Sequence, residues 1–277
     1  MDHYAKYEHL LFERQDDGVL LMTINRPDRY NATNETLHRE LSVVWRDIND
    51  DPQTRVVVVT GAGKAFSAGG DLDMLERMTT DYEKVTTQLK EASDVVYNMV
   101  NCDKPIISAI NGVAVGAGLT VALMADISII AQEARLTDGH LRLGVVAGDH
   151  AAIIWPLLCG LAKAKYYLLT SEFIDGPEAE RIGLVSRCVP RDELMNTALE
   201  VAHKLANGPQ HATRWTKRSL NNWLRSAGPA FDASVALEML AFLGDDAKEG
   251  VLALQEKREP EFPTARMTPP VRAPLSV

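Results

Sequence analysis

The stretch "KPIISAINGVAVGAGLTVALMADI", Lys104 to Ile127, decides the fold. Its short apolar run "PIISAI" is followed by a glycine-rich loop and then by a run of small residues that ends near Met124. A continuous apolar run of this length is typical of a strand buried on both faces. Glycine and alanine in the loop allow close approach to the backbone. The stretch therefore predicts a strand–loop–helix unit built around a parallel sheet.

A similar unit lies directly before it in the chain. "RVVVVT" predicts a buried strand, "GAGKAFSAGGD" a glycine-rich loop, and the residues from about Tyr82 to Val100 a helix. Nearer the N-terminus, "HLLFER" and "GVLLMTIN" predict a hairpin, and Asn34 is the expected N-cap of the helix that follows. "DISIIA" predicts a further strand. These repeated units indicate an α/β fold.

The C-terminal half is expected to be mostly helical. "DGPEAERIG" carries a cap, an early proline and a terminal glycine, and residues 208–259 read as helices that include the amphipathic "LEMLAFLGDDAKEG". The last eighteen residues contain five prolines, which predicts a loose tail.

Composition restricts the class of protein. The chain of 277 residues is 46% hydrophobic and 24% charged, as expected of a globular protein, and its net charge of −9 argues against nucleic-acid or anionic-membrane partners. The N-terminus lacks the apolar core of a signal peptide, and the longest apolar run, Val113 to Ala125, is too short to span a bilayer. Cys102, Cys159 and Cys188 show neither disulfide nor zinc spacing, so we expect a cytoplasmic protein without a metal.

The two glycine-rich loops admit two interpretations. Each loop follows a strand and precedes a helix, so its free backbone N–H groups could converge with those of the other loop on one carbonyl oxygen and form an oxyanion hole. Alternatively, the small residues only allow the helix to pack closely on the strand. Neither loop has the spacing of a P-loop or a dinucleotide fingerprint.

Four motifs occur in an order that resembles the crotonase superfamily, the enoyl-CoA hydratases and isomerases. The motifs are "NRPDRYNA", "KAFSAGGDLDML", "KPIISAINGVAVGAGLTVALMADI" and "EAERIGLVSRCVP". The resemblance implies a spiral core of ββα units over residues 1–205, a C-terminal helical oligomerisation region over 206–259, and a proline-rich tail over 260–277. It also implies a homotrimer or a hexamer made of two trimers. The expected substrate is an acyl-CoA thioester held as an enolate, with coenzyme A as part of the substrate and no permanently bound cofactor.

The same resemblance assigns residues to the site. Gly70 in "SAGGD" and Ala117 in "GAG" correspond to the two backbone donors of the oxyanion hole. Arg26, Lys64 and Ala68 are similar to residues that line the coenzyme A pocket. An acidic protein needs local cations to hold phosphates, although Arg26 and Lys64 could equally be solvated surface charges.

The chain departs from the hydratase pattern at both acid–base positions. A hydratase of this family uses two glutamates to place a water and move its proton. Thr120 stands where the first glutamate is expected, and His140 stands where the second is expected. A histidine can accept a proton near neutral pH, and a nearby carboxylate such as Asp149 could orient it. This histidine followed by "GD" and "WP" is similar to the superfamily branch that hydrolyses β-diketones by retro-Claisen cleavage.

Simpler roles remain open for each polar residue. Asp149 could cap the following helix, and His140 could be a hydrogen-bonded loop residue. Asp138 suits a turn, His150 lies beside the expected cap, and Thr120 could hold a water or simply pack. Two more residues are weaker candidates, because His38 lies on an amphipathic helix and Glu238 lies among the C-terminal helices.

Three functions follow from these alternatives. The favoured one is an enoyl-CoA hydratase or isomerase type of enzyme that uses His140 and Asp149 in place of the glutamate pair. The second is a β-diketone C–C hydrolase that works without coenzyme A. The third is a silent crotonase-fold scaffold, which the loss of both glutamates would also explain.

Overall fold

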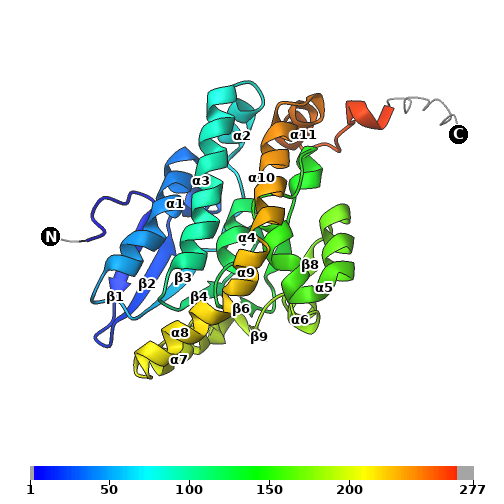
Figure 1. Ribbon diagram of the computed structural model, residues 1–277. Helices are drawn as coiled ribbons and strands as arrows, with labels where there is room; N and C mark the ends of the chain where they lie inside the picture. The colour runs from blue at the N-terminus through cyan, green and yellow to red at the C-terminus, as the bar shows by residue number, and fades with distance from the viewer. Residues whose placement is uncertain (1–2, 267–277) are drawn as a thin grey trace, which may run out of the picture.

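A six-stranded sheet forms the centre of the molecule (Figure 1), and the computed structural model describes residues 3–266. The spatial order is β1-β2-β3-β4-β6-β9, with β1 and β2 antiparallel and all other neighbours parallel. The predicted hairpin and parallel sheet are therefore confirmed. The strands are β1 (Leu10–Arg14), β2 (Val19–Ile24), β3 (Val56–Gly61), β4 (Ile106–Ile110), β6 (Ile127–Ala131) and β9 (Arg187–Val189).

A second, three-stranded sheet is made of β5 (Ala114–Val115), β7 (Arg135–Thr137) and β8 (Ile174–Asp175). Strands of two or three residues are too short to show an alternating pattern, so the sequence did not predict them. This sheet nevertheless positions the site. Val115 pairs with Thr137 in parallel register, which sets the residues after Val115 beside the residues after Thr137.

Helices cover the large sheet and pack against one another. Helix α7 contacts β2, β3, β4 and β6, while α1 packs on α3 and α3 packs on α10. The helices are α1 (Glu35–Asp50), α2 (Leu72–Met78), α3 (Tyr82–Asn101), α4 (Gly116–Leu123), α5 (Ala151–Thr170), α6 (Gly176–Arg181), α7 (Leu194–Ala206), α8 (Gln210–Leu220), α9 (Asn222–Ser226), α10 (Gly228–Phe242) and α11 (Asp245–Glu256). Figure 1 shows α10 running beside α3.

Several helix boundaries follow from the expected signals. The Asn34 side chain accepts a hydrogen bond from the Leu37 N–H, so Asn34 caps α1 as predicted. Asp175 caps α6 in the same way through the Glu178 N–H. The segment "LEMLAFLGDDAKEG" is not one helix, because α10 ends at Phe242 and Gly244 begins α11 in an extended conformation.

The tail is only partly described. Residues 263–266 form a short 3-10 turn, and the backbone N–H of Thr264 donates to Asp246, so this part of the predicted tail is held against α11. The rest of the predicted loose tail, residues 267–277, lies outside the described residues.

Candidate active site

The two glycine-rich loops lie against each other. A Cβ atom added to Gly69 would lie 3.3 Å from Val115, and one added to Gly118 would lie 2.3 Å from the Cβ of Ser67. The first loop therefore meets the start of α4 at a distance that only glycine permits at position 118. The close-packing interpretation of the loops is thus correct, and it brings the two proposed N–H donors into one region.

The backbone N–H groups of Gly70 and Ala117 are free to bind a ligand. The parallel bridge between Thr33 and Gly70 uses other amides, and Ala117 lies in the first turn of α4, where N–H groups lack partners within the helix. Among residues 3–266 neither amide donates to another protein group. Each follows a glycine with positive φ, Gly69 at 92° and Gly116 at 46°, a conformation that most other residues rarely adopt. Both residues line the same cavity, as an oxyanion hole requires.

His140 lies at the floor of this cavity. His140 starts the 3-10 turn η2 (His140–Leu143) shortly after β7. A Cβ atom added to Gly116 would lie 3.8 Å from the Cε1 atom of His140, so the ring lies next to the start of α4. Its Nδ1 contacts the Oδ2 atom of Asp138 at 3.0 Å, and both side chains are buried. Asp138 therefore orients the imidazole. The sequence had suggested Asp149 for this role, but Asp149 lies on the other side of the ring.

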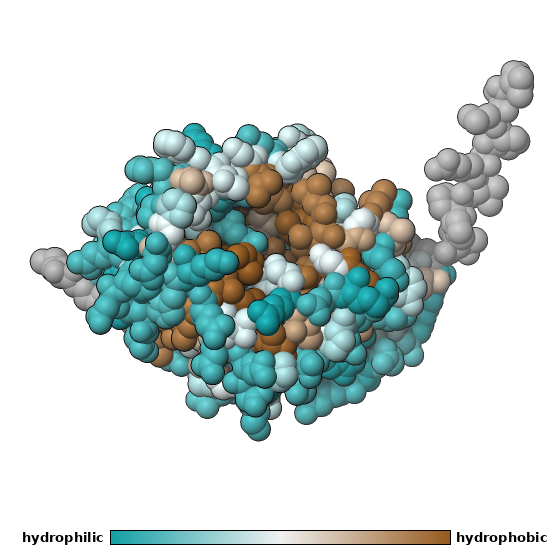
Figure 2. Space-filling view, turned by 90° about the horizontal axis from the view of Figure 1, so that it is seen from below, coloured by the Kyte–Doolittle hydropathy of each residue, from teal (hydrophilic) through white to brown (hydrophobic). Residues whose placement is uncertain are grey.

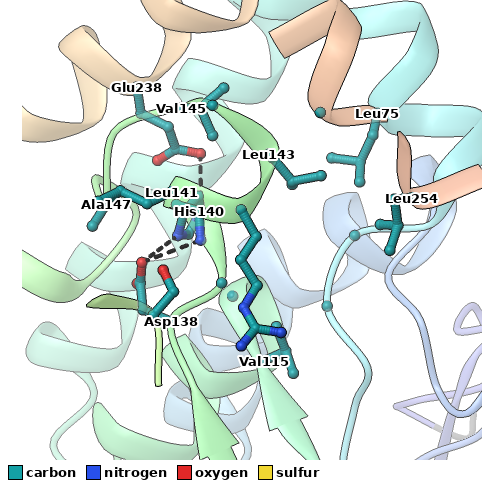
Figure 3. A pocket seen from close by; sticks show the side chains of 18 of the residues that line it. Leu75, Val115, Asp138, His140, Leu141, Leu143, Val145, Ala147, Glu238 and Leu254 are labelled. Atoms are coloured by element: carbon teal, nitrogen blue, oxygen red, sulfur yellow. Dashed lines mark hydrogen bonds and ion pairs between the residues drawn. The ribbon is translucent and has the colours of Figure 1, made fainter. Parts of the chain in front are cut away.

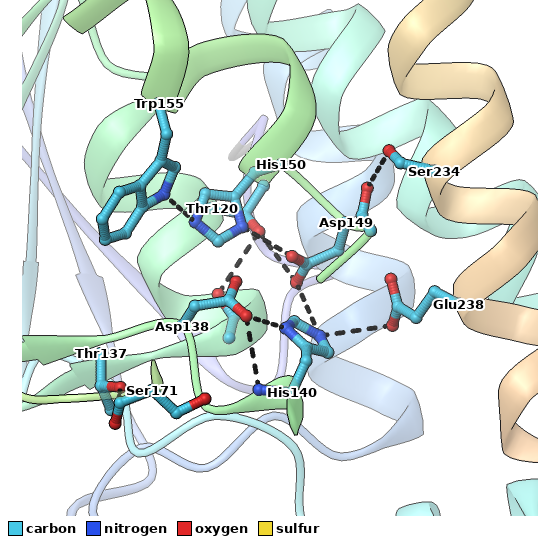
Figure 4. Close-up of polar contacts among 12 residues, drawn as sticks. Thr120, Thr137, Asp138, His140, Asp149, His150, Trp155, Ser171, Ser234 and Glu238 are labelled. Carbon is cyan, nitrogen blue, oxygen red and sulfur yellow. Dashed lines mark hydrogen bonds and ion pairs between the residues drawn. The ribbon is translucent and has the colours of Figure 1, made fainter. Parts of the chain in front are cut away.

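Two further carboxylates face the Nε2 atom of His140 (Figure 4). Glu238 of α10 approaches with Oε1 at 3.4 Å, and Asp149 approaches with Oδ2 at 3.8 Å. All three carboxylates around the ring are buried. The Oδ1 atom of Asp138 and the Oε2 atom of Glu238 are buried and have no hydrogen-bond partner among the described residues.

Asp149 does not cap a helix. His150 occupies the N-cap position of α5 and makes no capping hydrogen bond. Asp149 instead uses both oxygens inside the site: Oδ1 contacts His150 Nδ1 at 2.6 Å, and Oδ2 accepts from the Thr120 hydroxyl at 3.1 Å. Thr120, the residue at the first hydratase glutamate position, thus holds Asp149.

Burial and neighbouring charges shift the pKa values of His140, Glu238 and Asp149. Burial alone would lower the pKa of His140, but Asp138, Asp149 and Glu238 raise that pKa well above 6.5. Burial raises the pKa of Glu238 to about 7, against the opposing charge of His140. Burial also works to raise the pKa of Asp149, but His140, His150 and Thr120 outweigh it and keep the pKa well below 3.8. At neutral pH the site therefore holds an imidazolium, an ionised Asp149 and a glutamate close to half-titration.

The cavity is large and has mostly apolar walls. Its volume is about 1560 Å³, and Leu75, Leu143 and Val145 form part of its lining beside the polar floor (Figure 3). Ala68 lines it as expected from the coenzyme A assignment. Arg26 and Lys64 do not line it. Arg26 pairs with Asp71 and donates to the Ala32 carbonyl, while Lys64 lies on the surface.

His38 also reaches the cavity, although its place on an amphipathic helix favours a purely structural role when only the sequence is considered. It is buried, its Nδ1 contacts Glu91 at 2.7 Å, and it lines both the main cavity and a small side cavity beside Asp149 and Thr120. His150 is fully buried behind Asp149. The amphipathic pattern around His38 could not have revealed either contact.

Asp138 and Glu238 are the two site residues that sequence reasoning undervalued. Asp138 lies two residues before His140, and the intervening Gly139 has φ 79°, so the "DGH" sequence carried a usable local signal. Glu238 carried none, because only the packing of α10 on α3 and α5 brings it to the ring.

The cluster could in principle attract a cation, because ligand-type atoms of Asp138, His140 and Asp149 lie within 4.8 Å of one another. These atoms already bond to protein groups: Asp138 Oδ2 to His140, and both oxygens of Asp149 to His150 and Thr120. We therefore interpret the cluster as an acid–base group.

Together the fold and this site define a crotonase-fold enzyme. The chain belongs to the enoyl-CoA hydratase/isomerase family, whose pattern matches residues 14–265. A probable enoyl-CoA hydratase of Mycobacterium bovis is 33% identical over 92% of this chain and 98% of its own length.

Two solved structures show the range of similar proteins. An enoyl-CoA hydratase/isomerase from Mycobacterium paratuberculosis superposes with a TM-score of 0.84 at 36% identity, covering 88% of this chain and 97% of the other. A β-diketone hydrolase from the cyanobacterium Anabaena, bound to (S)-3-oxocyclohexyl acetic acid, has a TM-score of 0.81 at 30% identity, with the same coverage. Proteins similar to this chain thus bear the names of both reaction types considered above.

Proposed function

We propose that this enzyme adds water to an unsaturated acyl-CoA thioester, with the His140–Glu238 pair in place of the two hydratase glutamates. The buried 3.4 Å contact between His140 Nε2 and Glu238 Oε1, beside the free amides of Gly70 and Ala117, carries this proposal. The names of the curated relatives support acyl-CoA as the substrate class.

The pair can complete a full cycle of proton transfer. Ionised Glu238 accepts a proton from water while the water oxygen bonds to the β-carbon of the enoyl group. The π electrons move to the thioester oxygen, where the N–H groups of Gly70 and Ala117 stabilise the charge of the enolate. The α-carbon then takes a proton from the His140 imidazolium. Glu238 returns its new proton to His140 across their contact, and both residues regain their starting state.

The pKa of Glu238, about 7, suits this role, because a general base works best when its pKa lies near the working pH. Asp138 and Asp149 stabilise the imidazolium until it donates. Ionised Asp149 thus assists the pair without exchanging a proton itself.

A second candidate is hydrolysis of a β-diketone. The three carboxylates around one histidine and the similarity to the Anabaena hydrolase favour it. Here Glu238 takes a proton from water while the water oxygen adds to a ketone carbonyl. The bond to the carbon between the two carbonyls then breaks, which leaves a carboxylic acid and an enolate that occupies the oxyanion hole. His140 protonates the enolate carbon, and Glu238 returns its proton to His140. This reaction needs no coenzyme A handle, which is consistent with a cavity that Arg26 and Lys64 do not line.

One parallel experiment tests both candidates. The wild-type enzyme, His140→Ala and Glu238→Gln are assayed with crotonyl-CoA and with a cyclic β-diketone, and binding of each compound is measured by calorimetry. We expect hydration of crotonyl-CoA, a loss of turnover of roughly 100-fold or more in each variant, and nearly unchanged binding. Cleavage of the diketone without binding of any acyl-CoA would select the second candidate. Unchanged turnover in His140→Ala would contradict both.

A further inference from the structure

A chain of buried hydrogen bonds lies behind Asp149, away from the main cavity (Figure 4). The indole Nε1–H of Trp155 donates to Nε2 of His150 at 3.1 Å, and Nδ1 of His150 contacts Oδ1 of Asp149 at 2.6 Å. Trp155 and His150 are both fully buried. No step of the proposed reaction uses either residue.

The tryptophan determines which nitrogen of His150 carries the hydrogen. An indole nitrogen can only donate, so the Nε2 atom that accepts from it must be unprotonated. The hydrogen of a neutral His150 is therefore on Nδ1, where it points at Asp149. The geometry therefore assigns one tautomer, with Nδ1–H toward Asp149 and a bare Nε2 toward the indole.

The fixed tautomer in turn fixes Asp149. Its Oδ1 atom is held by His150, which leaves Oδ2 facing the Thr120 hydroxyl at 3.1 Å and His140 Nε2 at 3.8 Å. The same carboxylate lines a side cavity of about 10 Å³, which is roughly the space needed for one water. Ala117, His38 and Thr120 also line that cavity, so a water there would lie between Asp149 and these residues.

We propose that His150, held in its Nδ1–H tautomer by Trp155, is a positioning residue that keeps the Asp149 carboxylate ionised and turned toward His140 and the one-water side cavity. The ionisable groups facing Asp149 are His140 from η2, Asp138 before it, Glu238 from α10 and His38 from α1. Of these, His140 contributes most to keeping Asp149 ionised, and the His150 hydrogen bond adds to it. The activity part of this inference depends on the proposed function, whereas the tautomer part does not.

The tautomer is tested without substrate by ¹⁵N NMR of the histidine-labelled enzyme. In the wild type, His150 should show a protonated Nδ1 and an unprotonated Nε2, assigned by the signals that vanish in His150→Asn. Trp155→Phe should release the constraint, so that part of the population carries its hydrogen on Nε2. Trp45→Phe is the matched control, because Trp45 is fully buried and its Nε1–H meets no acceptor among residues 3–266. A wild-type His150 with its hydrogen on Nε2 would overturn the inference.

The positioning role is tested through the pH dependence of kcat. Asn places its side-chain NH₂ near the position of Nδ1, so His150→Asn should keep the wild-type profile, whereas His150→Phe removes the donor. In His150→Phe, kcat should fall roughly tenfold across the pH range, because Asp149 is no longer held in place. A second fall should also appear at acidic pH, below the limb set by Glu238, because Asp149 then protonates more easily. Identical profiles for His150→Asn and His150→Phe would refute positioning. If the wild type turns over neither substrate class, the proposed function fails, while the NMR result still stands by itself.

Discussion

Glu238 and His140 come from different parts of the chain and form one buried acid–base pair. Neither residue would suit its role alone. Burial raises the pKa of Glu238 to about 7, and the surrounding carboxylates raise the pKa of His140, so a proton can pass between them near neutral pH. Asp138 and Asp149 supply the negative charge that keeps the imidazolium stable in a buried site.

The raised pKa of Glu238 predicts a change of stability with pH. In the unfolded chain this carboxyl group loses its proton near 4.5, but in the folded protein it keeps the proton until about pH 7. The folded state therefore binds more protons between these values, and its stability falls as pH rises through this window. Glu238→Gln removes this loss. The free energy of unfolding of the variant, measured relative to that of the wild type, should therefore be higher at pH 8 than at pH 4 by up to about 3 kcal/mol.

Denaturant unfolding of both proteins at several pH values measures this difference. Glu133→Gln, which changes an exposed glutamate, is the control and should track the wild type throughout. The expectation fails if the stability difference between Glu238→Gln and the wild type does not change from pH 4 to pH 8.

At this scale the sequence predicted part of the site. His140, Asp149, Gly70 and Ala117 all line one cavity, as the motifs suggested. Whether Asp149 capped a helix or joined the chemistry could not be decided from its neighbours, because the choice depends on Thr120 and His150 occupying its two oxygens.

At the scale of the elements, the two loop–helix junctions are the important features. Each junction places a glycine with positive φ directly before a residue that lines the cavity and whose backbone N–H has no protein partner among the described residues. The sequence predicted the strand–loop–helix units, because buried strands and glycine loops have strong local signals. It missed β5, β7 and β8, whose register aligns α4 with His140, since their pairing is set by tertiary contacts.

Gly69→Ala tests the first junction. The substitution forces alanine into φ 92° and places its Cβ 3.3 Å from Val115, so we expect a loss of stability of about 1–2 kcal/mol. The displaced Gly70 amide should also reduce kcat by roughly tenfold or more.

Gly63→Ala is a matched control for the Gly69 variant. Gly63 has φ 74° and an open neighbourhood, and it does not line the cavity, so it should lose comparable stability without losing kcat. Thermal unfolding and steady-state kinetics of both variants provide the comparison. Equal kcat values for the two variants would exclude the Gly70 amide from catalysis.

Residues 3–266 carry apolar surface that their own core does not cover. Leu157, Leu161 and Tyr166 on α5 are exposed, as are Leu237 and Leu240 on α10. Figure 2 shows hydrophobic side chains gathered around a hollow on one face. By length and composition α5 could cross a membrane, but its first turns, which contain Trp155, belong to the buried site. Contacts between copies of the chain would cover such a surface.

The family resemblance predicts a trimer or a pair of trimers, and this surface supports that prediction. Light scattering should give three or six times the chain mass of 30.5 kDa. Leu157→Asp combined with Leu161→Asp should shift the enzyme to smaller species, because buried charges without partners are costly. Leu11→Asp, an exposed leucine on β1, is the control and should leave the mass unchanged. A wild-type monomer at micromolar concentration would refute the prediction.

The close contact between Gly118 and Ser67 links local chemistry to global folding. It joins segments that are far apart along the chain, which are also held by backbone hydrogen bonds of Ser67 with Val113 and Val115 and by the pairing of β3 with β4. A partly folded intermediate that lacks these long-range contacts has no assembled amide pair, however much helix it contains. During refolding, helical circular dichroism should recover before catalytic turnover, so an activity assay reports the last step of assembly.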